Sequence, residues 1–216
     1  MRGHRLAVAA ALAAAAFPTA AAADPPRPTI VQRPIPYGAE RKADMRAYSV
    51  RHYGLDRWQL RAPKVIVEHF AVTSSLDAIW STFAPNRADV ELKEKPGVCS
   101  HFAIGGDGRI EQLVPLGTMC RHTVGLNWTA IGIEHTGFSD RDVLTNRRQL
   151  TASWRLTAWL KCRYGIRRSD VIGHNENRSS PYHRERVARL KDQTHGDFTA
   201  ASMRTYRRGL DRRPCD

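Results

Sequence analysis

The chain has 216 residues, of which 42% are hydrophobic, and 34 Lys and Arg against 21 Asp and Glu, a formal net charge of +13. This length and hydrophobic content are enough for one domain with a real core, and they exclude a disordered or fibrous chain. No internal repeat is visible, and no aromatic-rich motif typical of RNA-binding domains accompanies the scattered arginines.

The first 23 residues predict export. Arg2 and Arg5 precede an apolar, Ala-rich run over 6–17, and small residues follow over 20–23. This order is typical of a secretory signal peptide, and the run is too short for a comfortable transmembrane helix. We therefore expect cleavage near Ala23 and a protein that is secreted or lies in the cell envelope, without a transmembrane segment. In that compartment the positive charge favours anionic wall polymers or membrane head groups over nucleic acid as partners.

Hydrophobic spacing and turn residues predict alternating helices and strands after an extended, Pro- and Arg-rich leader. Helices are expected over 38–54, from Ser74 or Ser75 to Pro85, from Thr145 to Tyr164, and from Thr199 onward. Strands are expected over 64–68, 101–104, 110–114, 130–135 and 169–173, with a Gly-rich hairpin turn over 105–108. The pattern predicts an α/β fold: a leader and N-terminal helix over 24–60, then one domain over 61–216 with a central mixed β-sheet flanked by helices on both faces.

The chain contains four cysteines: Cys99, Cys120, Cys162 and Cys215. An even number in an exported protein predicts two disulfides. We favour Cys99–Cys120 and Cys162–Cys215, because each pair could join neighbouring elements. Spacing leaves the choice open, since four cysteines allow three pairings. A four-cysteine zinc site is the weaker alternative, because the chain has no Cys-x-x-Cys motif.

Three short segments, far apart in the chain, each end on a residue that can bind zinc. VIVEH ends on His69, VIGH on His174 and THGD on Asp197. Three protein ligands with one open coordination position are typical of hydrolytic zinc sites. A fourth segment, IGIE, ends on Glu134, a candidate general base. On the pattern alone, simple alternation along a strand is the favoured explanation, with Glu134 as an outward-facing residue.

The segments VIVEHF, SHFAIGGDGRIEQLVP, CRHTVGLNWTAIGIEH, VIGH and QTHGDF, in this order, resemble the type 2 N-acetylmuramoyl-L-alanine amidases. These share their fold with the peptidoglycan recognition proteins. The resemblance implies one Zn²⁺ held by two His and a third Asp, Cys or His. It also implies hydrolysis of the amide between the lactyl group of N-acetylmuramic acid and the L-alanine of the stem peptide. The alternative is a peptidoglycan-binding protein of the same fold that does not cut its ligand, as some relatives are.

The resemblance assigns His69 and His174 as the two His ligands. For the third it favours Asp197, with His195 two residues earlier as a basic partner that stabilises the oxyanion. His183 is the rival third ligand, because its distance from His174 is closer to that in shorter family members, and His195 itself is another candidate. Choosing Asp197 implies an insertion over 175–192.

Glu134 corresponds to the catalytic Glu of the family, which would take a proton from water and pass it to the leaving nitrogen. Other members use a Tyr at the position where this chain has Ser100, so Glu134 is expected to carry more of the proton transfer. His122 corresponds to a His near the cleft and is expected to contact substrate. Asn127 and Trp128, in the same loop, are expected to line the groove.

Overall fold

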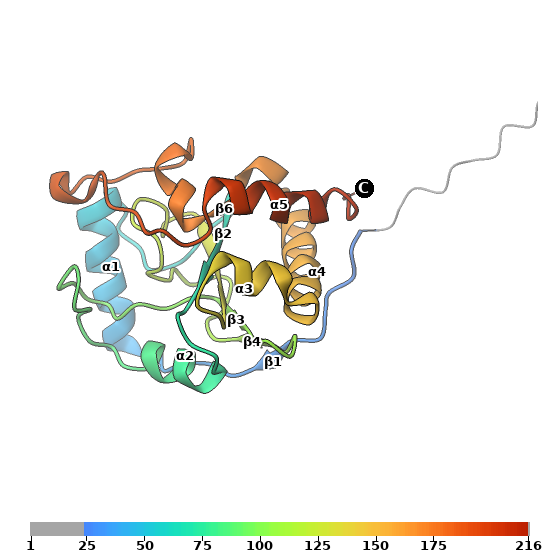
Figure 1. The fold of residues 1–216 in the computed structure, drawn as a ribbon. Coiled ribbons are helices and arrows are strands. Elements are labelled where there is room, and N and C mark those ends of the chain that lie inside the picture. The colour runs from blue at the N-terminus through green and yellow to red at the C-terminus, as the bar shows by residue number, and fades with distance from the viewer. Residues whose placement is uncertain (1–23, 216) are drawn as a thin grey trace, which may run out of the picture.

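The protein is built on a six-stranded mixed sheet with helices on both faces, as the sequence predicts (Figure 1). The computed structural model describes residues 24–215, so the predicted signal peptide lies outside the described residues. The strands are β1 (Val31–Gln32), β2 (Val65–Phe70), β3 (Phe102–Ile104), β4 (Ile110–Gln112), β5 (Ala130–His135) and β6 (Val171–Gly173). Their order is β1-β4-β3-β5-β2-β6, and of these pairings β3 with β4 is antiparallel while the others are parallel.

In the part of the chain that the structure describes, five α-helices cover the sheet: α1 (Ala39–Tyr53), α2 (Leu76–Phe83), α3 (Asp140–Thr145), α4 (Arg147–Tyr164) and α5 (Ala200–Leu210). Helices α3, α4 and α5 pack against one another on one side, while α1 and α2 lie on the other (Figure 1). Within residues 24–215, no helix combines the length and apolar character needed to cross a bilayer.

Most predicted helix ends are confirmed at their capping residues. Gly54 ends α1 in the left-handed conformation with φ 70°, and the side chains of Ser75 and Thr199 cap α2 and α5. The prediction of one helix starting at Thr145 is wrong. Thr145 ends α3, and Asn146 caps α4 by accepting hydrogen bonds from two backbone N–H groups. Helix α3 was not predicted, because six residues show too little periodicity to reveal a helix.

The register of β2 and β5 decides where their polar side chains point. His69 pairs directly with Glu134, and side chains alternate along a strand, so both lie on the same face of the sheet. Glu68 points to the opposite face, which α4 and α5 cover. There Thr157 and Tyr206 donate hydrogen bonds of 2.8 and 2.9 Å to its carboxylate. One face of these strands is therefore closed by packed helices, and the other presents a histidine beside a glutamate.

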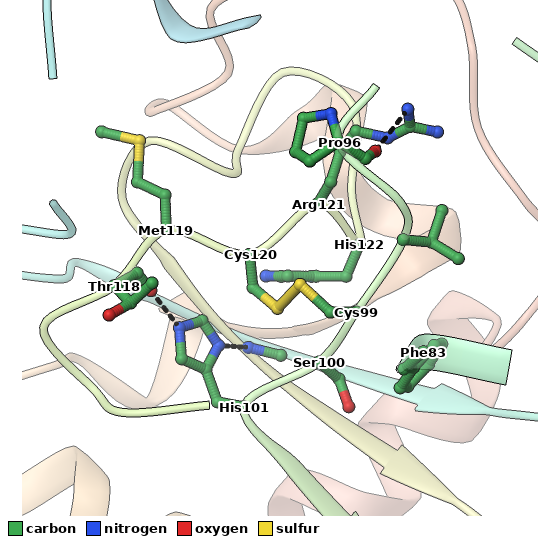
Figure 2. The surroundings of a disulfide bond; sticks show 12 residues. Phe83, Pro96, Cys99, Ser100, His101, Thr118, Met119, Cys120, Arg121 and His122 are labelled. Carbon is green, nitrogen blue, oxygen red and sulfur yellow. Dashed lines mark hydrogen bonds between the residues drawn. A yellow bond between two sulfur atoms is a disulfide. The ribbon is translucent and has the colours of Figure 1, made fainter. Parts of the chain in front are cut away.

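Both predicted disulfides, Cys99–Cys120 and Cys162–Cys215, are present. The first joins the segment before β3 to the loop after β4 (Figure 2). The second joins the end of α4 to the C-terminal segment. They close loops of 21 and 53 residues, which corresponds to about 3 and 4 kcal/mol of lost chain entropy in the unfolded state.

Arg41, on α1, is a buried cation that ties three segments together. Its guanidinium donates hydrogen bonds to the carbonyl oxygens of Pro36, Phe83, Ala84, Gly97 and Val98, at 2.8 to 3.3 Å. We expect Arg41→Met to lower the free energy of unfolding by about 3 kcal/mol, because these carbonyl groups lose a charged donor. Urea denaturation measures the change. Arg46→Met on the same helix, where the side chain is exposed, should leave the midpoint nearly unchanged.

Candidate metal centre

Three side chains from separate segments meet where β2 and β6 end. His69 is the fifth residue of β2, His174 directly follows β6, and Asp197 lies in the loop before α5. Their candidate ligand atoms all lie within 4.8 Å of one another. One oxygen of Asp197 is 2.9 Å from Nδ1 of His69, and the other is 3.4 Å from Nδ1 of His174. The structure thus brings together the three residues that the sequence selects as candidate zinc ligands.

The two other candidates for the third ligand lie in different places. His183 packs against Gly125, where an added Cβ would stand 2.2 Å from its Nε2, and it is not a member of the three-residue cluster. His195 lies beside the cluster instead. Its ring stacks on His174 with centroids 4.7 Å apart, and its Nε2 is 3.1 Å from a carboxylate oxygen of Glu91. His195 is therefore a neighbour of the candidate ligands.

Cation binding needs neutral imidazoles and a carboxylate, and His174 and Asp197 are already in these forms. Burial lowers the pKa of His69, but the hydrogen bond and charge of Asp197 outweigh that effect and raise it, so a cation has to compete with a proton on His69. Burial lowers the pKa of His174 to about 4, so its ring is neutral near pH 7. Burial raises the pKa of Asp197, but its contacts with His174 and His69 outweigh that effect, so the pKa lies well below its usual range. Nε2 of His174 is buried and has no hydrogen-bond partner in the described part of the chain. Two imidazoles and a carboxylate form a donor set that fits Zn²⁺.

Glu134 lies next to this cluster, with 8% of its surface exposed. Burial raises the pKa of Glu134 to about 7; the charge of His69 lowers it, and that of Asp197 raises it further. A carboxyl group that titrates near neutrality suits a general base. A divalent cation held beside it would favour the ionised form, because the positive charge stabilises a carboxylate.

His122 reaches the inner wall of the site because β5 carries a glycine opposite it. A Cβ added to Gly132 would lie 2.7 Å from the imidazole, so only glycine lets the ring pack there. Nδ1 of His122 is 3.2 Å from Nε2 of His69 and 2.8 Å from the hydroxyl of Thr123. Burial, with the neighbouring histidines, holds the pKa of His122 well below its usual range. The adjacent Cys99–Cys120 disulfide anchors this segment (Figure 2).

Asn127 and Trp128 hold the loop that follows His122. Asn127 is fully buried, and its side-chain amide oxygen Oδ1 accepts hydrogen bonds from the backbone N–H groups of His122 and Thr123 at 2.8 and 2.7 Å. The ring of Trp128 packs against the main hydrophobic cluster, with the guanidinium of Arg184 5.0 Å from its centroid. These contacts make both residues supports of the loop, and their direct role in ligand binding stays a prediction.

A cavity of about 200 Å³ opens beside His174. Its lining includes His122, His174, His195 and residues 89–92. This last segment was not among the predicted site residues. On it, Asp89 pairs with Arg121 and Glu91 contacts His195. No motif marks these residues, so their place at the site depends on tertiary contacts alone.

Two exposed apolar side chains follow the strands that carry His69 and Glu134. Val72 is 65% exposed and Phe138 60% exposed, and the segments that carry them are joined by a bridge between Thr73 and Gly137. Val72 has φ 49°, which is an outlier for a β-branched residue. Strained residues of this kind cluster at functional sites. Neither side chain is part of the lining of the cavity beside His174.

The sequence was also compared with known proteins. A family model described as N-acetylmuramoyl-L-alanine amidase matches residues 59–186, more than half of the chain. No curated protein matches the sequence of this chain. Among solved structures it is similar to the endolysine N-acetylmuramoyl-L-alanine amidase LysCS from Clostridium intestinale URNW, with 20% identity, a TM-score of 0.50 and coverage of 70% of this chain and 84% of that chain.

Two further similar structures are less close in shape. One is the amidase AmiD from E. coli, with 22% identity, a TM-score of 0.43 and coverage of 54% of this chain and 49% of that chain. The other is PGRP-SA of Apis mellifera, with 26% identity, a TM-score of 0.41 and coverage of 54% and 73%. The likeness to LysCS supports the fold.

Proposed function

We propose that this chain, which belongs to the N-acetylmuramoyl-L-alanine amidase family, is a zinc-dependent peptidoglycan hydrolase. Its substrate would be the amide between the lactyl group of N-acetylmuramic acid and the L-alanine of the stem peptide. The observation that carries the proposal is the convergence of His69, His174 and Asp197 next to Glu134.

His69, His174 and Asp197 would hold one Zn²⁺. Zinc bound at such a site lowers the pKa of a water molecule toward neutrality and polarises a carbonyl group. The residues fit this ion in donor type and in the closeness of their ligand atoms, and His174 and Asp197 also fit it in protonation state. His69 and His174 are buried, so packed side chains shield these two residues from bulk water.

Glu134 would accept a proton from the attacking water and pass it to the leaving nitrogen of L-alanine. The C–N bond breaks and a C–O bond forms, so no covalent enzyme intermediate is needed. His195 would donate a hydrogen bond to the oxyanion that develops on the carbonyl, a contribution typically about 2.7–4 kcal/mol for one donor. The carboxylate of Glu91, 3.1 Å from its Nε2, would fix the orientation of that ring.

We also propose that the protein acts in the cell envelope or outside the cell. The signal-peptide pattern over 1–23 supports export. Two disulfides support the same compartment, because such bonds persist in oxidising surroundings.

Mass spectrometry of purified peptidoglycan after incubation with the pure protein tests the proposed function. We expect stem peptides that begin with L-alanine, their loss after treatment with a chelator, and their return when Zn²⁺ is restored. Lactyl–alanine linkages that stay intact in all samples would contradict hydrolysis. In that case, co-sedimentation with the wall would indicate the alternative, a non-catalytic peptidoglycan-binding protein of the same fold.

Asp140, at the start of α3, holds the turn that carries Asp197. Its carboxylate accepts hydrogen bonds from the backbone N–H groups of Phe198 at 2.8 Å and Thr199 at 2.9 Å. We expect Asp140→Ala to weaken Zn²⁺ binding about 10-fold, because residues that support metal ligands typically contribute 10- to 100-fold. Competition with a chromogenic chelator measures the affinity.

The matched control is Asp142→Ala, which removes the same charge two residues later on α3. Asp142 accepts a hydrogen bond of 2.9 Å from the backbone N–H of Phe138, so its loss should leave Zn²⁺ affinity nearly unchanged. An equal loss of affinity in both variants would show that Asp140 acts through α3 as a whole and has no specific effect on the position of Asp197.

A further inference from the structure

An arginine-lined groove lies apart from the metal cluster and its cavity. One hollow of about 720 Å³ lies among the 25–29 segment, the middle of α4 and the C-terminal residues 212–214. A second hollow of about 410 Å³ lies along the first part of α4 and the turn before β4. The two hollows share Gly108, Ala152 and Arg155, so they are continuous. Together they form what we call the arginine groove, lined by Arg27, Arg147, Arg148, Arg155, Arg212 and Arg213.

The charge of this groove is not neutralised from within the described part of the chain. Among residues 24–215, none of the six arginines forms an ion pair with a carboxylate, whereas arginines elsewhere do: Arg46 with Asp56, Arg168 with Asp211 and Arg207 with Glu176. Asp107 is the acid in the lining, and its carboxylate accepts a hydrogen bond from the backbone N–H of Arg109. The groove therefore keeps a positive charge that an anionic ligand would offset.

Arg213 lies near other arginines of the groove and is held in place by its own contacts. Burial, followed by the charges of Arg155 and Arg212, lowers the pKa of Arg213. Arg213 lies 5.2 Å from the ring centroid of Trp154 and donates a hydrogen bond of 2.6 Å to the carbonyl of Gly209. Like charges gathered in this way repel one another, so a bound anion would relieve the repulsion.

The lining indicates which kind of anion fits. A guanidinium binds a phosphate through two parallel hydrogen bonds, and arginines spread along two joined hollows suit phosphates repeated along a chain. A membrane-binding surface needs apolar side chains that insert, yet the large exposed hydrophobic residues of the described chain, Val31, Val50, Val72, Val90 and Phe138, do not line the groove.

Single-stranded nucleic acid needs aromatic rings on which bases can stack. Neither hollow has an aromatic residue in its lining, and Arg213 and Arg27 of the groove lie over Trp154 and Trp159. We propose that the arginine groove binds a polyol phosphate polymer of the cell envelope, a chain of phosphodiester-linked alcohol units. This binding would hold the protein on the wall without taking part in hydrolysis.

Isothermal titration with soluble poly(glycerol phosphate) tests the proposal. The groove variant combines Arg148→Gln, Arg155→Gln and Arg212→Gln, three exposed residues outside the metal site. A control variant removes the same charge elsewhere on the surface through Arg61→Gln, Arg87→Gln and Arg204→Gln. We expect the groove variant to lose at least about tenfold in affinity and the control to lose much less, because contacts with phosphates dominate such binding and weaken with salt.

An equal loss of affinity in both triple variants would show that only the net charge of the protein matters. Wild-type affinity in the groove variant would show that the groove does not bind the polymer. Either result overturns the proposal. Phosphatidylglycerol vesicles and single-stranded DNA serve as competing probes. The proposal would also be contradicted if the vesicles or the DNA bound more tightly than the polymer and lost this affinity in the groove variant. Cleavage of a soluble muropeptide and the thermal midpoint should be unchanged in the groove variant, so this test can fail without affecting the proposed hydrolysis.

Discussion

Replacing Glu134 by Gln should abolish the release of stem peptides from purified wall while the fold and Zn²⁺ binding persist. Gln has the same shape as Glu but cannot accept a proton at neutral pH. Loss of general acid–base catalysis typically lowers kcat by about 10²- to 10⁴-fold. The resemblance implies that Ser100 corresponds to a Tyr of other family members, and the Ser100 hydroxyl is buried and donates to the carbonyl of Phe102, so we expect the effect at the upper end. Turnover of a soluble muropeptide and chelator competition measure the two properties separately.

Glu111→Gln is the matched control for this experiment. Glu111 is also a buried glutamate of the sheet, but its carboxylate pairs with Arg33 and Arg109. Its replacement should lower the free energy of unfolding, because the ion pairs are weakened, and should leave kcat of the folded protein near the wild-type value. If the Glu134→Gln variant had the same kcat as the Glu111→Gln variant, another group would have to be the base.

The ends of the helices were predictable where a local residue determines them. Gly54 accepts a positive φ, and the side chains of Ser75 and Thr199 bond to the first turn of their helices. At Thr145 the same reasoning failed, because its hydroxyl donates to the carbonyl of Arg141 within α3 and Asn146 takes the capping position. Both residues are good caps in sequence, so only the structure of the preceding turn distinguishes them.

The candidate site was predictable in part. His69 and Glu134 stand near the ends of hydrophobic strands, and parallel strands bring such ends to one edge of the sheet. The direct pairing of these two residues is a matter of register, which the sequence alone left open. The segment 89–92 could not be predicted at all, because its position depends on the pairing of Asp89 with Arg121 and of Glu91 with His195.

The third candidate ligand shows most clearly what spacing along the chain leaves undecided. Asp197 and His183 both lie in irregular segments, where no periodicity indicates the direction of a side chain. The turn after Asp197 places Phe198 at φ 46°, a conformation that costs of order 1–3 kcal/mol for a residue other than glycine. Asp140, 58 residues earlier, helps to hold that turn through its hydrogen bonds. This contact joins two distant loops, so no local pattern encodes it.

Replacing Asp197 by Ala should therefore empty the metal site and abolish hydrolysis. Two imidazoles remain, but the charged ligand is lost, so Zn²⁺ affinity should fall by more than the 10- to 100-fold typical of residues that only support a ligand. His183→Ala should keep both Zn²⁺ binding and turnover, because that ring packs against Gly125 outside the cluster. Chelator competition and muropeptide turnover on both variants measure the difference. If the His183→Ala variant lost the metal and the Asp197→Ala variant retained it, His183 would be the third ligand. The 175–197 segment would then have to rearrange when Zn²⁺ binds.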